Sequence, residues 1–169
     1  MAKKVSFMGI FLAFALILSY IESLIPFFYG VPGMKLGLTN LLIVLLLYLS
    51  DWKCALSINV LRIVLVGFLF GNAFSILYSL SGGLLSFAGM CLVKKFFSLR
   101  MTSVSVVGGI THNLGQIMVA CLVVSNYQLI LYFPVLFLGG LVTGLCIGII
   151  SNILYPYVHH IILSEGEKS

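Results

Sequence analysis

Charged residues are scarce in this sequence. Only 8% of its 169 residues are charged, whereas 62% are hydrophobic, and the mean hydropathy is +1.23. A water-soluble fold of this length has too little interior to hide so much apolar surface. The scarcity of charge therefore excludes a soluble domain and predicts an all-α integral membrane protein in which residues 1–169 form a single domain.

Acidic residues are rarer still, since the four in the chain are Glu22, Asp51, Glu165 and Glu167. Chemistry on a magnesium-bound diphosphate requires clustered carboxylates, because Mg²⁺ prefers oxygen ligands, and this chain has no such paired-acid motif. It also lacks the GxxxxGK[ST] loop that binds ATP phosphates. We therefore expect no catalysis, no metal and no cofactor in this chain, and any ATP hydrolysis must come from partner proteins.

Close pairs of cysteines are missing as well. The four cysteines stand singly in apolar segments, without CxxC spacing and without a histidine at metal-ligand spacing: Cys54, Cys91, Cys121 and Cys146. A framework of this kind fits neither a zinc site nor a paired redox motif. We expect these cysteines to be small residues of the core.

What the chain does have is long apolar runs separated by breakers. They predict six transmembrane helices, at about 5–25, 36–50, 54–71, 73–93, 103–124 and 131–156. The first run continues to about Ile25, which favours a membrane span over the alternative, a secretory signal peptide. The second is too short for a hydrocarbon core of about 30 Å, so either its neighbours bury it or residues 26–37 dip back into the membrane.

The positive charges predict the topology. With the amino terminus inside, seven basic residues fall on the cytoplasmic side: Lys3, Lys4, Lys53, Lys94, Lys95, Arg100 and Lys168. By the positive-inside rule, both termini are expected in the cytoplasm. The net charge of +5 thus reports topology within a lipid bilayer, and no nucleic-acid partner is expected.

Two ionisable residues are expected deep in the membrane. Arg62 lies eight residues into the third span and His112 nine residues into the fifth, so both are about 12 to 14 Å deep. Asn59 precedes Arg62 by three residues, and Gln116 follows His112 by one turn, so each helix has a polar face. Such residues are costly in hydrocarbon unless they face a cavity or a partner.

These faces predict a cavity open to the outside that binds a small polar or anionic-headed molecule. The candidate binding residues are Glu22, Lys35, Asn40, Asn59, Arg62, Asn72, His112, Asn113 and Gln116. Two structural alternatives stay open. Arg62 can instead form an ion pair with Glu22, and the amide side chains can serve as hydrogen-bonding glue between helices.

Small residues form a further pattern. In the last three spans they occur at 81–83, 108–109 and 139–148, where close helix packing is the expected role. On the first span, Gly9 and Ala13 form a GxxxA face that can instead dock a partner protein.

Five motifs in order, "SYIESLIP", "PGMKLGLTN", "LRIVLVGFLFG", "LYSLSGGLLS" and "GGITHNLGQ", carry a resemblance that covers nearly the whole chain. The sequence resembles the Gx transporter family, also labelled heptaprenyl diphosphate synthase component I. That family is grouped with the S components of energy-coupling factor (ECF) transporters, six-helix proteins of the bacterial cell membrane that capture micronutrients from outside.

The resemblance implies three partners: a transmembrane coupling subunit and two cytoplasmic ATPases. In S components an AxxxA-type face on the first helix meets the coupling subunit, and Gly9 and Ala13 occupy that place here with GxxxA. The first extracellular loop of the family caps the binding site, which implies that residues 26–37, with Lys35, form a lid. Two other functions stay open: a non-catalytic accessory of a prenyl diphosphate synthase, and a stand-alone facilitator.

Overall fold

The chain folds into helices only, in the residues that the computed structural model describes, which are 2–24, 37–97 and 99–167 for the backbone and 5–24, 37–97 and 99–162 for the side chains. Six α-helices and one 3₁₀ helix follow one another: α1 (Ala2–Leu24), α2 (Leu38–Leu49), α3 (Trp52–Phe70), α4 (Ala73–Phe97), α5 (Met101–Val124), η1 (Tyr127–Tyr132) and α6 (Phe133–Glu167). The predicted all-α class and the six helices are thus confirmed.

Five of these helices, all except α2, are long and apolar enough to cross a membrane. Helix α2 has 12 residues, which at 1.5 Å per residue gives about 18 Å, well short of a hydrocarbon core of about 30 Å. It begins after Gly37, which has a positive φ of 74°, and ends where Ser50 turns to an extended conformation. The prediction of six spans is therefore corrected to five helices of spanning length and one short apolar helix.

Helix α2 is the most deeply buried element. The side chains of residues 42–47 are all buried, with exposures of 0 to 9%, and they pack with Met90 of α4, Met101 of α5 and Ile147 of α6. Neighbouring helices therefore cover the short helix, as one of the two predicted explanations requires. The other explanation concerns residues 26–37, which lie outside the described residues except for Gly37.

The carboxyl end of α2 is held by polar groups of other residues. Lys94 of α4 donates a hydrogen bond to the carbonyl oxygen of Leu47, and its Nζ atom lies 4.4 Å from the centre of the Tyr48 ring. The Ser50 hydroxyl donates to the carbonyl oxygen of Leu46 at 2.8 Å. The last carbonyl groups of a helix lack partners within it and carry negative partial charge, so a cation here stabilises the end.

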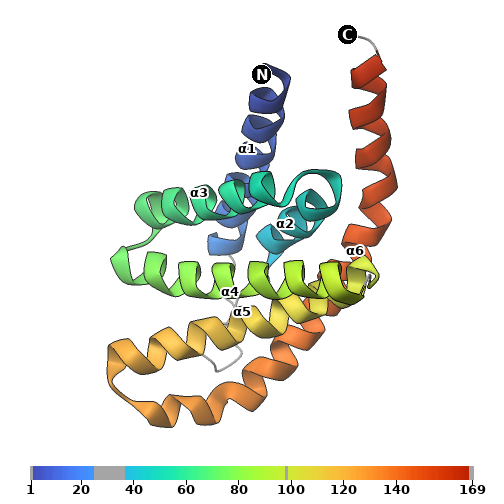
Figure 1. Cartoon of the computed structure of the whole chain (residues 1–169). Coiled ribbons are helices and arrows are strands. Elements are labelled where there is room, and N and C mark those ends of the chain that lie inside the picture. Colours follow the sequence, from blue (N-terminus) through green and yellow to red (C-terminus); the bar gives the residue numbers. More distant parts are fainter. Residues whose placement is uncertain (1, 25–36, 98, 168–169) are drawn as a thin grey trace.

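Helices α4, α5 and α6 approach one another through glycines, and Figure 1 shows them stacked in this order. A Cβ atom added to Gly109 of α5 would lie 2.3 Å from the carbonyl oxygen of Gly140 on α6, and one added to Gly115 would lie 2.6 Å from that of Ser81 on α4. No larger residue fits at such backbone contacts. The predicted packing role of the small residues in these helices is confirmed.

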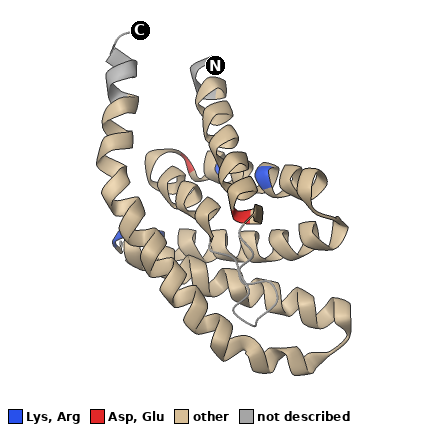
Figure 2. Ribbon diagram, turned by 180° about the vertical axis from the view of Figure 1, so that it is seen from behind, with Lys and Arg blue, Asp and Glu red and all other residues tan. Residues whose placement is uncertain are grey.

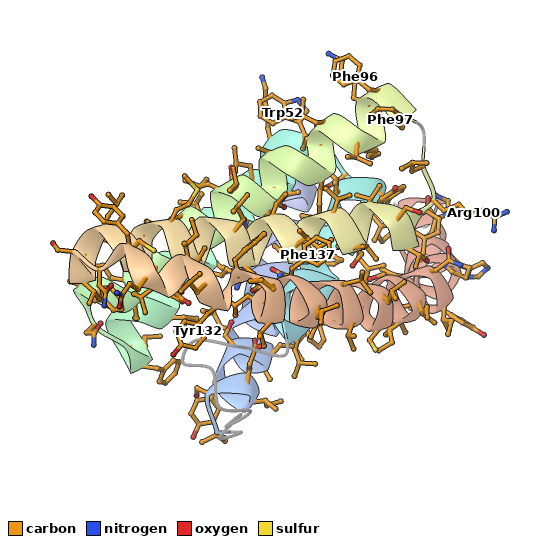
Figure 3. All side chains as sticks on the ribbon, turned by 90° about the horizontal axis from the view of Figure 1, so that it is seen from below. Trp52, Phe96, Phe97, Arg100, Tyr132 and Phe137 are labelled. Atoms are coloured by element: carbon orange, nitrogen blue, oxygen red, sulfur yellow. The ribbon has the colours of Figure 1, made fainter. Side chains whose placement is uncertain are left out.

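The outer surface is apolar. Figure 2 shows that the charged residues occupy little of the described ribbon. In Figure 3 the side chains of Trp52, Phe96 and Phe97 point away from the helices, and these residues are 54, 69 and 69% exposed. Cys146 is exposed too, so the prediction of a core position is wrong for this cysteine, whereas Cys54 and Cys121 are buried. A surface of this kind suits contact with lipid, where exposed apolar groups cost nothing.

Helix α6 extends well beyond its predicted end at residue 156. It contains 35 residues and includes Pro156 without ending there. Proline removes one hydrogen bond within a helix, a loss that neighbouring groups tolerate in membrane helices. The start of α1 and the end of α6 project on the same side of α3 and α4 in Figure 1. That this side is cytoplasmic stays a prediction.

Candidate ligand-binding pocket

A cavity of about 200 Å³, which we call the main cavity, lies between α1, α2, α3, α4 and α5. It brings together side chains from distant parts of the chain. Five of the nine candidate binding residues line it: Glu22, Asn40, Arg62, His112 and Gln116. The polar faces of α3 and α5 therefore meet around one space, together with polar groups from the ends of α1 and α2.

Arg62 is the buried cation of the main cavity, with a side-chain exposure of 9%. Its Nε and Nη2 atoms donate to Oδ1 of Asn59 at 3.2 and 2.9 Å, and Nη2 also donates to Oδ1 of Asn40 at 3.2 Å. Both partners are neutral amides, which fix the direction of the guanidinium without contributing a negative charge. Among the described residues no carboxylate contacts this buried cation, although Glu22 faces the same cavity, so the site favours a further negative group.

Asn59, one turn before Arg62 on α3, orients the guanidinium and is itself hydrogen-bonded to α4. Its Nδ2 atom donates to the carbonyl oxygen of Gly83 at 3.2 Å, and the residue is 2% exposed. A Cβ atom at Gly83 would lie 2.6 Å from Cδ1 of Ile63, so the end of that side chain would have to move. Asn59 therefore positions Arg62 and does not itself line the main cavity among the described residues.

Glu22 is the acidic residue of the main cavity. Its Oε1 atom accepts a hydrogen bond from the backbone N–H of Gly37, the residue that begins α2. Among the described residues, no carboxylate oxygen lies within 4.0 Å of the Arg62 guanidinium. The alternative of a direct Arg62–Glu22 ion pair is therefore not what the structure has, although both residues face the same cavity.

The rest of the lining combines an apolar wall with hydroxyl groups. Ile63, Val66 and Phe70 of α3 form the apolar wall. Ser75 and Ser79 of α4 line the cavity as well, and sequence reasoning missed them. Their signal is the spacing of four residues, which places both hydroxyl groups on one face of a helix.

A second, smaller cavity of about 30 Å³, the inner cavity, lies between α2, α4, α5 and α6 and shares Gly37, Asn40, His112 and Gln116 with the main cavity. Two buried polar atoms in its lining, Nε2 of Gln116 and Oγ of Ser86, have no hydrogen-bond partner among the described residues. Each of these side chains is 2% exposed. The volume is sufficient for a water molecule, the usual partner of such buried polar groups.

Asn113 faces the inner cavity from α5. Its Nδ2 atom donates to the carbonyl oxygen of Leu136 on α6 at 2.7 Å. This is the interhelical hydrogen bond that the alternative interpretation of the amide residues predicts. Asn113 therefore joins α5 to α6 beside the pocket.

One further candidate residue, Asn72, lines neither cavity, and another is not described. Lys35 lies outside the described residues. Asn72 is exposed at the start of α4, where its Oδ1 atom accepts a hydrogen bond from the backbone N–H of Ser75 at 2.8 Å. That is the geometry of a helix cap, and the described lining of the main cavity does not include Asn72.

The candidate docking face on α1 is exposed. Gly9 and Ala13 both lie on the surface, and a Cβ atom added to Gly9 would meet nothing within 4 Å. In contrast, Ala15 and Ser19 are buried on the opposite face, and the Ser19 hydroxyl pairs with that of Thr39 at 3.0 Å. Helix α1 thus uses one small-residue face inside the protein and leaves the other open.

The comparison that decides the family is a match over most of the chain. The sequence profile described as heptaprenyl diphosphate synthase component I matches residues 11–154. The chain belongs to the heptaprenyl diphosphate synthase component I family. Neither the curated proteins nor the solved structures contain a match to it.

The segment that matches the heptaprenyl diphosphate synthase component I family, residues 11–154, contains all the described residues of the main cavity. The family name refers to a synthase, yet the described acidic residues are dispersed: Glu22 lies in the main cavity and Asp51 is exposed before α3. Two carboxylates on one metal ion, the arrangement that diphosphate chemistry uses, are not built by the described residues.

Proposed function

We propose that this protein is the substrate-binding subunit of an ATP-driven micronutrient uptake system of the energy-coupling factor type. It takes a small polar or anionic-headed molecule into the main cavity from outside the cell. The observation that carries this proposal is Arg62, a buried guanidinium that faces a cavity of about 200 Å³ and whose hydrogen bonds, among the described residues, go to amide oxygens. A purely structural arginine would be expected to have a carboxylate partner.

The pocket has the composition of a small-molecule site. Ligand pockets combine an apolar wall with a few polar groups that fix orientation, and here Ile63, Val66 and Phe70 face Arg62 and Gln116. Backbone groups at the start of α2 also border the cavity at Gly37. Irregular backbone of this kind is expected in membrane proteins where it borders a cavity.

The second half of the proposal is a coupling partner that docks on α1. The exposed face at Gly9 and Ala13 allows close approach of another helix, because neither residue projects a large side chain. Energy from ATP would enter through that partner, since this chain has no phosphate-binding loop. The two faces of α1 support this docking surface, because Gly9 and Ala13 are exposed whereas Ala15 and Ser19 are buried.

The family name favours a second candidate function. A membrane accessory of a prenyl diphosphate synthase would need no catalytic carboxylates of its own, so the dispersed acidic residues agree with it as well. Co-purification with a soluble prenyl synthase, together with a changed product length when this chain is removed, would favour that function. Co-purification with a membrane coupling protein and ATPases would favour uptake.

The test of ligand capture is native mass spectrometry of the full chain, extracted from cells in mild detergent. We expect the wild-type protein to retain a small molecule and Arg62→Gln to lose it, because glutamine keeps hydrogen-bonding groups but not the charge. Ser57→Ala is the control, since Ser57 is exposed on the same helix and bonds only to the carbonyl oxygen of Lys53. A wild-type protein without any retained molecule, or an Arg62→Gln variant that retains it fully, would refute ligand capture.

A further inference from the structure

Two opposite charges face the main cavity without contacting each other. Arg62 comes from α3 and Glu22 from the end of α1, and both line the same space of about 200 Å³. Among the described residues, no N–O distance of 4.0 Å or less joins them. The cavity is therefore polarised, with a positive group on one helix and a negative group on another.

Both groups retain free hydrogen-bonding capacity. The hydrogen bonds of Arg62 use Nε and Nη2, which leaves the Nη1 donors without a partner among the described residues. The Glu22 carboxylate accepts from Gly37, whereas a carboxylate offers about four acceptor positions. Each charge can thus take one more partner from inside the cavity.

The charge pattern discriminates between classes of ligand. A singly charged anion is attracted by Arg62 but repelled by Glu22, and a singly charged cation is attracted by Glu22 but repelled by Arg62. The low dielectric of a membrane interior strengthens both the attraction and the repulsion. A molecule with both charges gains at both ends. The apolar wall at Ile63 and Val66 then suits the hydrocarbon spacer between the two charged groups.

We infer that the ligand is a small zwitterion, whose anionic group binds Arg62 and whose ammonium group binds Glu22. This inference rests on the proposed ligand capture and specifies its substrate class. A cavity of about 200 Å³ is smaller than the range of about 300 to 1,000 Å³ that is usual for drug-sized ligands, so it suits a short amino-acid-like compound.

The test uses defined probes on the full chain purified in detergent. The probes are ω-amino acids from glycine to 5-aminopentanoate, with butanoate and butylammonium as singly charged controls at equal ionic strength. We expect at least one ω-amino acid to raise the midpoint of thermal unfolding by about 3 °C or more at saturation, because ligands that bind only the folded state stabilise it. Butanoate and butylammonium should each give a clearly smaller shift.

Variants of the protein test which residue binds each charged group of the ω-amino acid. Glu22→Gln should reduce the shift by the best ω-amino acid to that of the carboxylate of equal length, and Arg62→Gln should abolish both shifts. Ser57→Ala should leave all shifts as in the wild type. The inference is overturned if no ω-amino acid stabilises the protein, if butanoate stabilises it equally well, or if Glu22→Gln changes nothing.

The two proposals fail separately. A singly charged molecule retained in native mass spectrometry, and lost on Arg62→Gln, would leave ligand capture intact and overturn the zwitterion. If the protein retains no molecule and no probe changes its stability, both are wrong. A retained zwitterion that Glu22→Gln releases would support both.

Discussion

Asn59 receives two hydrogen bonds from Arg62, one turn further along α3. Its Oδ1 atom accepts from Nε at 3.2 Å and from Nη2 at 2.9 Å. A neutral amide in this place keeps the guanidinium oriented without neutralising it. The positive charge thus remains available to the main cavity, which is the property on which ligand capture depends.

Asn59→Asp should weaken ligand retention, and it also removes the hydrogen bond from Asn59 to the carbonyl oxygen of Gly83, so the unfolding midpoint of the variant is measured alongside. Aspartate has nearly the shape of asparagine, but it would form an ion pair with Arg62 and compete with an anionic group of the ligand. We expect at least about tenfold weaker retention, equivalent to about 1.4 kcal/mol. Quantitative mass spectrometry of the retained ligand measures the effect.

The control for added charge is Asn126→Asp, at an exposed position before η1 where aspartate can still accept the hydrogen bond from Gln128. It should retain ligand like the wild type. Equal retention by Asn59→Asp and the wild type would show that the charge of Arg62 is not used.

Gly109→Ala should destabilise the protein by about 1 to 3 kcal/mol, the usual cost of overpacking. The added methyl group would meet the carbonyl oxygen of Gly140 at 2.3 Å and force α5 and α6 apart. Equilibrium unfolding of the detergent-solubilised protein measures the change. Gly9→Ala is the matched control, because its methyl group meets nothing within 4 Å, and equal stability losses in the two variants would contradict this packing.

Lys94→Met should lower the free energy of unfolding by about 1 kcal/mol, since it removes the cation that bonds to the carboxyl end of α2. Methionine keeps most of the aliphatic length, so the loss reports mainly the charge and the hydrogen bond. Lys95→Met is the control, because Lys95 is exposed at the next position. If both variants lose the same stability, the effect comes from net charge and not from the end of α2.

Ala13→Leu should disrupt assembly with the proposed coupling subunit and leave the isolated protein folded. Leucine would project from the exposed face of α1 into the space that a partner helix needs. Co-purification of the partner and the unfolding midpoint of the isolated chain are the two measurements. Ala88→Leu, on the exposed side of α4, is the control, and undiminished assembly of Ala13→Leu would exclude this face as the docking surface.

Local sequence features predicted most of the fold. Apolar runs and breakers place all six α-helix starts within about three residues of where they begin in the structure. The end of α6 is the largest error, because the predicted helix ends at residue 156 although the observed helix continues through Pro156. A membrane helix tolerates this proline, whereas the rule that proline ends a helix comes mainly from water-soluble proteins.

The polar residues of the site were harder to assign from local patterns. Asn72 is a candidate binding residue by its sequence position, but it accepts the hydrogen bond of a helix cap from Ser75. Ser79 and Ser86 were overlooked, since a serine in an apolar run looks like a small packing residue until its surroundings are known. Whether a hydroxyl group faces lipid, a helix or a cavity depends on the neighbouring helices.

The sequence by itself determined that this protein is an all-helical membrane protein with deep ionisable residues, because hydropathy and spacing are local properties of the chain. Only the tertiary structure decided which of those residues meet. It places Arg62 and Glu22 on one cavity without an ion pair, buries the short helix α2, and lets glycines of α5 and α6 touch. These relationships join residues far apart in the chain, and helix packing sets their distances.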